Sequence, residues 1–318
     1  MNRRRTLLAA GACAGLVPKL LRAQEKTTLV LATATPGGGF PVYGAAFADS
    51  VNEADPTLSV QPKNTKGSTE NIPLIERGEV DIALVTGEPL YEALNGIGRA
   101  PAKLTIVTAM YSQAGMFVTR GDSAHRSIAD LVGKPVAFGA KGSGLVILAR
   151  YVLDGLGYDM ERDFQAVYLD RAGDGPAMVL DGRVAALWGG GSGWPGFTAM
   201  ASSPGGARFI VPDAAQSARI VAKHSLLKPM SVPAGSYPGQ PAAIASVGSW
   251  SFVIARPTLA DDAAYRLARA VHRSEAAIAK RLPQAAETTA ANTVAAVPRA
   301  DLLHPGVQRY LREARLLA

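Results

Sequence analysis

Short apolar runs alternate with stretches of helical spacing along the first third of the chain. The runs at 29–33, 58–60, 82–85 and 104–109 have the length of buried strands. Between the first two, residues 42–51 place apolar side chains on one helical face. Strands that alternate with helices at this spacing predict parallel βαβ units.

A second block of the same kind begins near Met116. A short helix closed by glycine is predicted at 128–134. It is followed by a strand at 135–138, a turn at 139–144 and an apolar helix at 145–156 that Gly155 and Gly157 end. A strand at 166–169, a helix at 177–181 and a strand at 184–188 complete it. The repetition predicts two similar α/β lobes. Further on, the pattern predicts a loop at 232–241, a strand at 250–255 and helices at 261–280 and 307–316.

The first 23 residues have the composition of a signal peptide. Arg3-Arg4-Arg5 precedes an apolar run at 7–17 that is too short to span a bilayer, and Leu21-Arg22-Ala23 is an acceptable cleavage site. The arginines leave both Sec and twin-arginine export open. We therefore expect the mature protein in the periplasm.

Removing this segment changes the charge and the cysteine content. Residues 1–23 hold five of the 33 basic residues and no acid, so 28 basic and 26 acidic residues remain, a net charge of +2. The chain's pI of about 9.6 is therefore no sign of nucleic-acid binding. The one cysteine, Cys13, leaves with the segment, so no disulfide is expected.

The stretch 65–85 contains a glycine-serine turn, a short helix, a glycine and a buried strand. Ser68 or Thr69 is expected to cap the helix, and Gly78 to end it in the left-handed conformation. Free backbone N–H groups at such a helix start favour an anion.

Three glycine-rich turns, at 36–39, 67–68 and 139–144, each lie between an apolar run and a helical pattern. At the carboxyl ends of parallel strands they would meet at one crevice. The alternative is that glycine simply makes tight turns. None matches a dinucleotide-binding or Walker pattern. The loop 189–195 offers Trp188 or Trp194 as a pocket wall, or else holds a core tryptophan.

The sequence gives little sign of catalysis. The four histidines are isolated, so neither a metal site nor a cofactor is predicted. Ser143 and Ser192 lack the G-x-S-x-G pattern, although a triad assembled from distant positions stays open as an alternative. Arg77, Arg150 and Arg171 could clamp a carboxylate, but surface positions are the commoner role of arginine.

Four segments together resemble the TAXI-type extracytoplasmic solute receptors of TRAP transporters. They are 67–71 with 78–83, 131–137 with 142–144, 232–240, and 304–313. The similarity covers essentially the whole mature chain in the same order. The family has a tyrosine just after the first glycine pair, where this chain has Phe40, with Tyr43 one helical turn on.

The resemblance implies a type II periplasmic-binding-protein fold, an α/β fold of two lobes joined by hinge strands. The lobes would be 24–112 with 246–318, and 113–245. It implies a receptor, not an enzyme, that delivers a small carboxylate or amino acid such as glutamate or 2-oxoglutarate to TRAP permease subunits. A tripartite tricarboxylate receptor and an exported hydrolase are the alternatives. The expected ligand-binding residues are Thr35, Gly38, Gly39, Phe40, Tyr43, Gly67, Ser68, Asn71, Ser143, Gly144, Trp188, Gly190 and Trp194.

Overall fold

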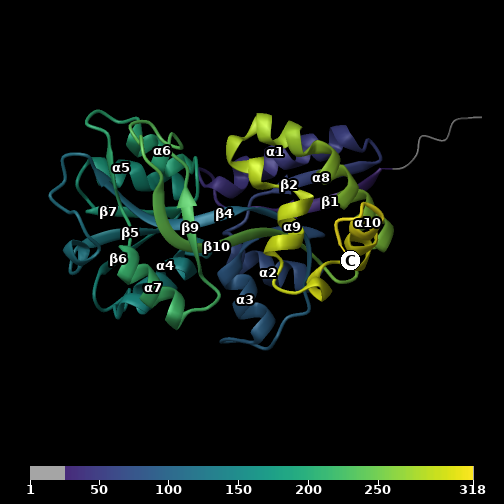
Figure 1. The fold of residues 1–318 in the computed structure, drawn as a ribbon, viewed down its shortest axis with the longest axis horizontal. Coiled ribbons are helices and arrows are strands. Elements are labelled where there is room, and N and C mark those ends of the chain that lie inside the picture. Colours follow the sequence, from purple (N-terminus) through teal and green to yellow (C-terminus); the bar gives the residue numbers. More distant parts are fainter. Residues whose placement is uncertain (1–25, 318) are drawn as a thin grey trace, which may run out of the picture.

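A computed structural model describes residues 26–317 of the chain. The predicted signal peptide lies outside these residues. Within them the expected alternation of strands and helices is present, arranged around one continuous path of hydrogen-bonded strands (Figure 1). No helix of the described part is long and apolar enough to cross a bilayer.

The first group of elements holds three parallel strands and the helices that follow them. It also receives the C-terminal helices, of which the long helix at 261–281 packs beside the helix at 39–54 and the last one packs on that long helix. Its elements are β1 (Thr27–Ala32), α1 (Gly39–Ala54), β2 (Leu58–Lys63), α2 (Ser68–Glu76), β3 (Ile82–Thr86), α3 (Gly87–Asn95), α8 (Asp261–Arg281), η3 (Pro283–Glu287), α9 (Ala290–Ala296), η4 (Ala300–Leu302) and α10 (Pro305–Glu313).

The second group repeats the βαβ arrangement in the middle of the chain. Its elements are η1 (Ala129–Leu131), β5 (Pro135–Ala140), α4 (Gly144–Leu156), β6 (Gln165–Leu169), η2 (Ala172–Asp174), α5 (Gly175–Leu180), β7 (Ala186–Gly190), α6 (Pro195–Ala201), β8 (Ala207–Ile210), α7 (Ala214–Lys223) and β9 (Lys228–Val232).

Two long antiparallel strands cross between the groups. They are β4 (Thr105–Arg120) and β10 (Ile244–Ala255), which pair with each other. They form the middle of the strand order β2-β1-β3-β10-β4-β7-β5-β6. The register shifts between Trp250 and Phe252, opposite Ser112 and Ala109. Such an irregularity increases the twist and bends the strands. The long strand β4 can thus pair with β10 in one sheet and with β7 and β8 in the other.

Each group has its own hydrophobic core. One core draws on residues between 29–111 and 252–311, and the other on residues between 114 and 247. The cores meet at the crossing strands. The lobe boundaries expected from the sequence stay a prediction.

The C-terminal tail is fastened to β4 by His304. Its backbone N–H donates to the Ile106 carbonyl at 3.0 Å, while its Nδ1 accepts from the N–H of Gly306 at 3.2 Å and so caps α10. Its Nε2 lies 3.0 Å from the Leu259 carbonyl, which requires the proton on Nε2. Burial lowers the pKa of His304, so the ring is neutral. Any side chain at Gly306 would collide with the Asp261 carbonyl, which explains the His-Pro-Gly run.

Candidate ligand-binding site

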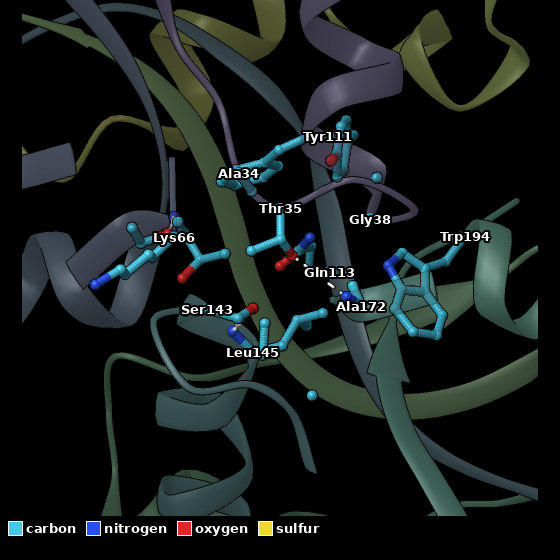
Figure 2. A pocket seen from close by; sticks show the side chains of 18 residues that line it. Ala34, Thr35, Gly38, Lys66, Tyr111, Gln113, Ser143, Leu145, Ala172 and Trp194 are labelled. Atoms are coloured by element: carbon cyan, nitrogen blue, oxygen red, sulfur yellow. Dashed lines mark hydrogen bonds between the residues drawn. The ribbon is translucent and has the colours of Figure 1, made fainter. Parts of the chain in front are cut away.

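A small pocket lies between the two groups of elements, beside β4 (Figure 2). Its volume is about 40 Å³, enough for about three water molecules. The lining residues are Ala34, Thr35, Gly38, Gly39, Phe40, Lys66, Gly67, Ser68, Thr86, Tyr111, Gln113, Gly139, Ala140, Ser143, Gly144, Leu145, Ala172 and Trp194.

Four helices of nine or more residues begin at the pocket. The N-cap residues of α1, α2, α3 and α4 are Gly38, Gly67, Thr86 and Ser143, and all four line it. Only Ser143 caps its own helix with a side chain, accepting from the N–H of Leu145 at 3.2 Å. Each helix start carries a partial positive charge worth about 0.3–1 kcal/mol to a nearby anion, up to about 2 where partly buried. The lining includes Lys66 and no acid.

Gly67, not Ser68 or Thr69, is the N-cap of α2, so the expected cap is wrong. Gly67 has φ +115°, which a residue with a side chain rarely adopts, and a Cβ there would lie 2.8 Å from the Gly142 carbonyl oxygen. Ser68 is buried and accepts from the N–H of Thr86 at 3.2 Å. Gly78 does take the expected left-handed conformation, with φ +69°.

Three buried side chains at the pocket have polar atoms without a hydrogen-bond partner among the described residues. They are the Tyr111 hydroxyl, Thr86 Oγ1 and Gln113 Oε1. An unpaired buried polar group costs about 1–3 kcal/mol. Burial raises the pKa of Tyr111 far above its ordinary value, so its hydroxyl keeps its proton and can donate. These atoms are suited to a bound polar molecule.

The two groups touch each other around the pocket. Thr69 donates to the Gly142 carbonyl from its N–H at 3.2 Å and from its hydroxyl at 3.0 Å. The Ala172 N–H donates to Thr35 Oγ1 at 3.3 Å, drawn as the dashed line in Figure 2. At the far side Arg150 and the Tyr151 hydroxyl both contact Glu92. The structure therefore has the geometry of a closed clamp.

Glycine is required where the groups approach most closely. A Cβ at Gly144 would lie 1.9 Å from Thr86 Oγ1, and one at Gly37 would lie 2.5 Å from the Cα of Gly173. A side chain at Gly37 would collide with the backbone of Gly173, and one at Gly144 would collide with the side chains of Thr86 and Ser68.

The pocket brings together nine of the thirteen residues expected from the sequence. Its wall includes parts of all three glycine-rich turns and the aromatic rings of Phe40 and Trp194. The nine are Thr35, Gly38, Gly39, Phe40, Gly67, Ser68, Ser143, Gly144 and Trp194. Their contact with a ligand stays a prediction.

Tyr43 and Asn71 lie outside the wall. Tyr43 is fully buried in the first core, where its hydroxyl lies 3.2 Å from Thr288 Oγ1. Asn71 donates to the Thr33 carbonyl at 2.8 Å and the Leu84 carbonyl at 2.7 Å, and so ties the turn to two strands. Both side chains hold the framework behind the pocket.

Trp188 and Gly190 also lie outside the wall. Trp188 is a core residue whose Nε1 donates to the Leu145 carbonyl at 2.8 Å, and its ring packs 4.6 Å from that of Phe117. Gly190 lies in β7, where a Cβ would be 3.1 Å from the Ala114 carbonyl oxygen. Of the two tryptophans expected at the wall, the structure places Trp194 there.

The loop 232–241 supports Trp194 from behind. The Tyr237 hydroxyl donates to the Gly191 carbonyl at 2.6 Å and accepts from the Trp194 N–H at 3.0 Å. Tyr237 is therefore the residue that fixes the turn before α6, and it gives the Val-Pro-Ala-Gly-Ser-Tyr segment a physical role.

Tyr111 is the pocket residue that the sequence pattern did not indicate. It ends an apolar run on β4 that resembles any core strand. Its ring packs edge-on against Tyr43, with centroids 5.5 Å apart. Since Phe40 has no hydroxyl and Tyr43 points into the core, Tyr111 supplies the tyrosine hydroxyl at this pocket.

The candidate catalytic and clamp residues have other partners. In the described part of the chain no histidine ring bonds to a serine, and no cluster of three metal-ligating side chains occurs. Arg77 pairs with Glu79, and Arg150 with Glu92. Arg171 is exposed and does not line the pocket.

Two βαβ-based groups, two crossing strands and a pocket at their junction define a type II periplasmic-binding-protein fold, as expected from the sequence. Residues 31–314 match the model of the NMT1-like family, and the chain belongs to that family.

Solved structures share this fold at low identity. One described as a periplasmic transporter is 13% identical, with a TM-score of 0.56 over 83% of this chain and 88% of its own. A Bordetella bronchiseptica RB50 protein is 14% identical, with a TM-score of 0.56 over 91% and 98%. A TctC solute-binding protein from Polaromonas is 15% identical, with a TM-score of 0.50 over 83% and 89%.

Proposed function

We propose that this chain is a periplasmic solute receptor that closes on a small organic carboxylate and delivers it to TRAP permease subunits. The observation that carries the proposal is the convergence of four helix starts on one pocket. These starts attract negative charge without an arginine clamp.

The chemistry of the pocket supports a carboxylate in particular. Carboxylate oxygens accept hydrogen bonds only, and the wall offers them the hydroxyls of Tyr111, Ser68 and Ser143. Gln113 Oε1 is an unpaired acceptor, so it suits a ligand that also has a donor, such as an amino acid. The resemblance to TAXI receptors suggests glutamate, glutamine and 2-oxoglutarate for the first tests.

The size of the pocket bears on the tricarboxylate alternative. At about 40 Å³ the closed pocket has less room than any of these ligands needs, so the lobes would have to separate for glutamate and by more for a tricarboxylate. The Pro-Gly-Gly-Gly turn at 36–39 keeps a receptor of the tripartite tricarboxylate kind as the second candidate.

A thermal-shift screen of the purified mature protein tests the proposal. Ligand at 100 times its Kd stabilises the folded form by about 2.7 kcal/mol, or roughly 5 °C or more in Tm. The panel contains glutamate, glutamine, 2-oxoglutarate and citrate, with sugars and divalent cations as controls. A shift with a carboxylate supports the proposal. A shift with a sugar or cation only, or with nothing, contradicts it.

A further inference from the structure

A second and much larger cavity lies on the other side of the crossing strands. Its volume is about 830 Å³, at the upper part of the range of small-molecule sites. Its walls come from α3, β9, β10 and the segment after α9.

The floor of this cavity is apolar. Leu90 and Leu94 come from α3, and Trp250 and Phe252 from β10. Tyr91 of α3 is 39% exposed, one of the more exposed large apolar side chains in the described part. A concave apolar surface of this size is typical of a binding site.

The charged residues around it all have one sign. The lining includes Lys103, Lys228 and Arg299, and no aspartate or glutamate. Arg299 is paired with Asp301 at 3.0 Å. Lys103 and Lys228 are exposed, and their side-chain ammonium groups make no ion pair or hydrogen bond with the residues between 26 and 317. The free positive charge thus lies beside the apolar floor.

We infer that this cavity binds a small amphipathic anion, with its apolar body on the floor and its acidic head beside Lys103 and Lys228. The proposed ligand is a free small molecule, such as a medium-chain fatty acid or an aromatic sulfonate. The inference depends on the size of the cavity and on its charge. An apolar floor without cations beside it would fit any hydrophobic partner, whereas Lys103 and Lys228 favour one that carries an anionic group.

This site is separate from the candidate ligand pocket. Thr86 lines the small pocket, while the next residue, Gly87, lines the large cavity. Gly87 packs closely on β10, because a Cβ there would lie 2.6 Å from Ser249 Oγ. The two cavities are therefore divided by one turn of backbone, and the small one has no room for an amphipathic ligand.

The probes are 8-anilinonaphthalene-1-sulfonate, whose fluorescence rises in apolar surroundings, and decanoate as its competitor. We expect saturable dye binding to the folded protein and displacement by decanoate. Reversing both charges, in Lys103→Glu with Lys228→Glu, should weaken both ligands at least tenfold. Ala295→Trp places a large ring in the cavity wall at an exposed position on α9 and should also weaken both ligands.

Lys134→Glu is the matched control, because Lys134 is also exposed and lies outside the cavity. It should bind like the unchanged protein. Binding by the double-lysine and Ala295→Trp variants that is as tight as binding by the unchanged protein would overturn the inference. So would dye binding that appears only on thermal unfolding, or binding to phosphatidylglycerol vesicles without binding of free decanoate. A shift with small carboxylates in the earlier screen is independent of all these outcomes.

Discussion

Glu88 is a buried acid whose protonation should control the stability of the protein. It lies in the first turn of α3 with no exposed surface, and neither carboxyl oxygen has a partner in the described residues. Burial raises the pKa of Glu88 from 4.5 to about 7, and the nearby hydroxyls of Ser249 and Thr86 offset only part of this. The folded protein therefore keeps this proton more tightly than the unfolded chain does.

The sign and size of the effect follow from the two pKa values. Below pH 4.5 the carboxyl is protonated in both states, so it costs nothing. As pH rises from 4.5 to 7 the unfolded chain loses the proton first, and the free energy of unfolding falls. Above pH 7 the loss in the free energy of unfolding is complete. A difference of 2.5 between the two pKa values corresponds to about 3 kcal/mol. About 2.5 kcal/mol of this loss occurs between pH 5 and pH 8.

Glu88→Gln should remove this pH dependence, because an amide of the same shape does not titrate. The assay is Tm by calorimetry at pH 5 and pH 8 for both proteins. The difference between the two pH values should shrink in the variant by about 4 °C. Glu79→Gln is the control, because Glu79 pairs with Arg77 on the surface and such pairs contribute little. Parallel pH profiles for Glu88→Gln and the unchanged protein would refute the reasoning.

Three further predictions concern the framework of the clamp. Asn71→Ala should lower the free energy of unfolding by about 2–4 kcal/mol in urea titration, because two buried carbonyls each lose the hydrogen bond from this side chain; a loss below 1 kcal/mol would contradict this. Gly144→Ala should prevent closure and increase the radius of gyration in X-ray scattering, since its Cβ would collide with Thr86; an unchanged radius would count against a closed clamp. Tyr237→Phe should cost about 1–3 kcal/mol in the same titration, and no loss would show that its hydroxyl is dispensable.

The βαβ alternation and the glycine turns could be predicted because each depends on local sequence. The crossing strand β4 could not be predicted as one element. Ser112 and Gln113 interrupt its apolar pattern, so the sequence suggested one strand before them and a new block after them. In the structure these polar residues lie where the strand passes between the cores, with the N–H and hydroxyl of Ser112 bonded to Glu287.

The site could be predicted only as far as it depends on turns. Gly38, Gly67 and Ser143 are at the pocket because turn chemistry places them at helix starts. The roles of Tyr111, Tyr43 and Trp188 depend on which face of an element meets the other lobe, and that is decided by long-range packing. The strand β9 was missed for a related reason, since its exposed Lys-Pro-Met-Ser-Val sequence has little apolar character.

The central claim is that this protein is a clamp that holds a small carboxylate at Tyr111 and the four helix starts. The most direct test is calorimetric titration of the best carboxylate from the screen into the unchanged protein and into Tyr111→Phe. We expect one site per chain and an affinity about tenfold weaker in the variant, equal to about 1.4 kcal/mol for one lost hydrogen bond. Equal affinities for the two proteins, or no heat of binding with any carboxylate, would contradict it.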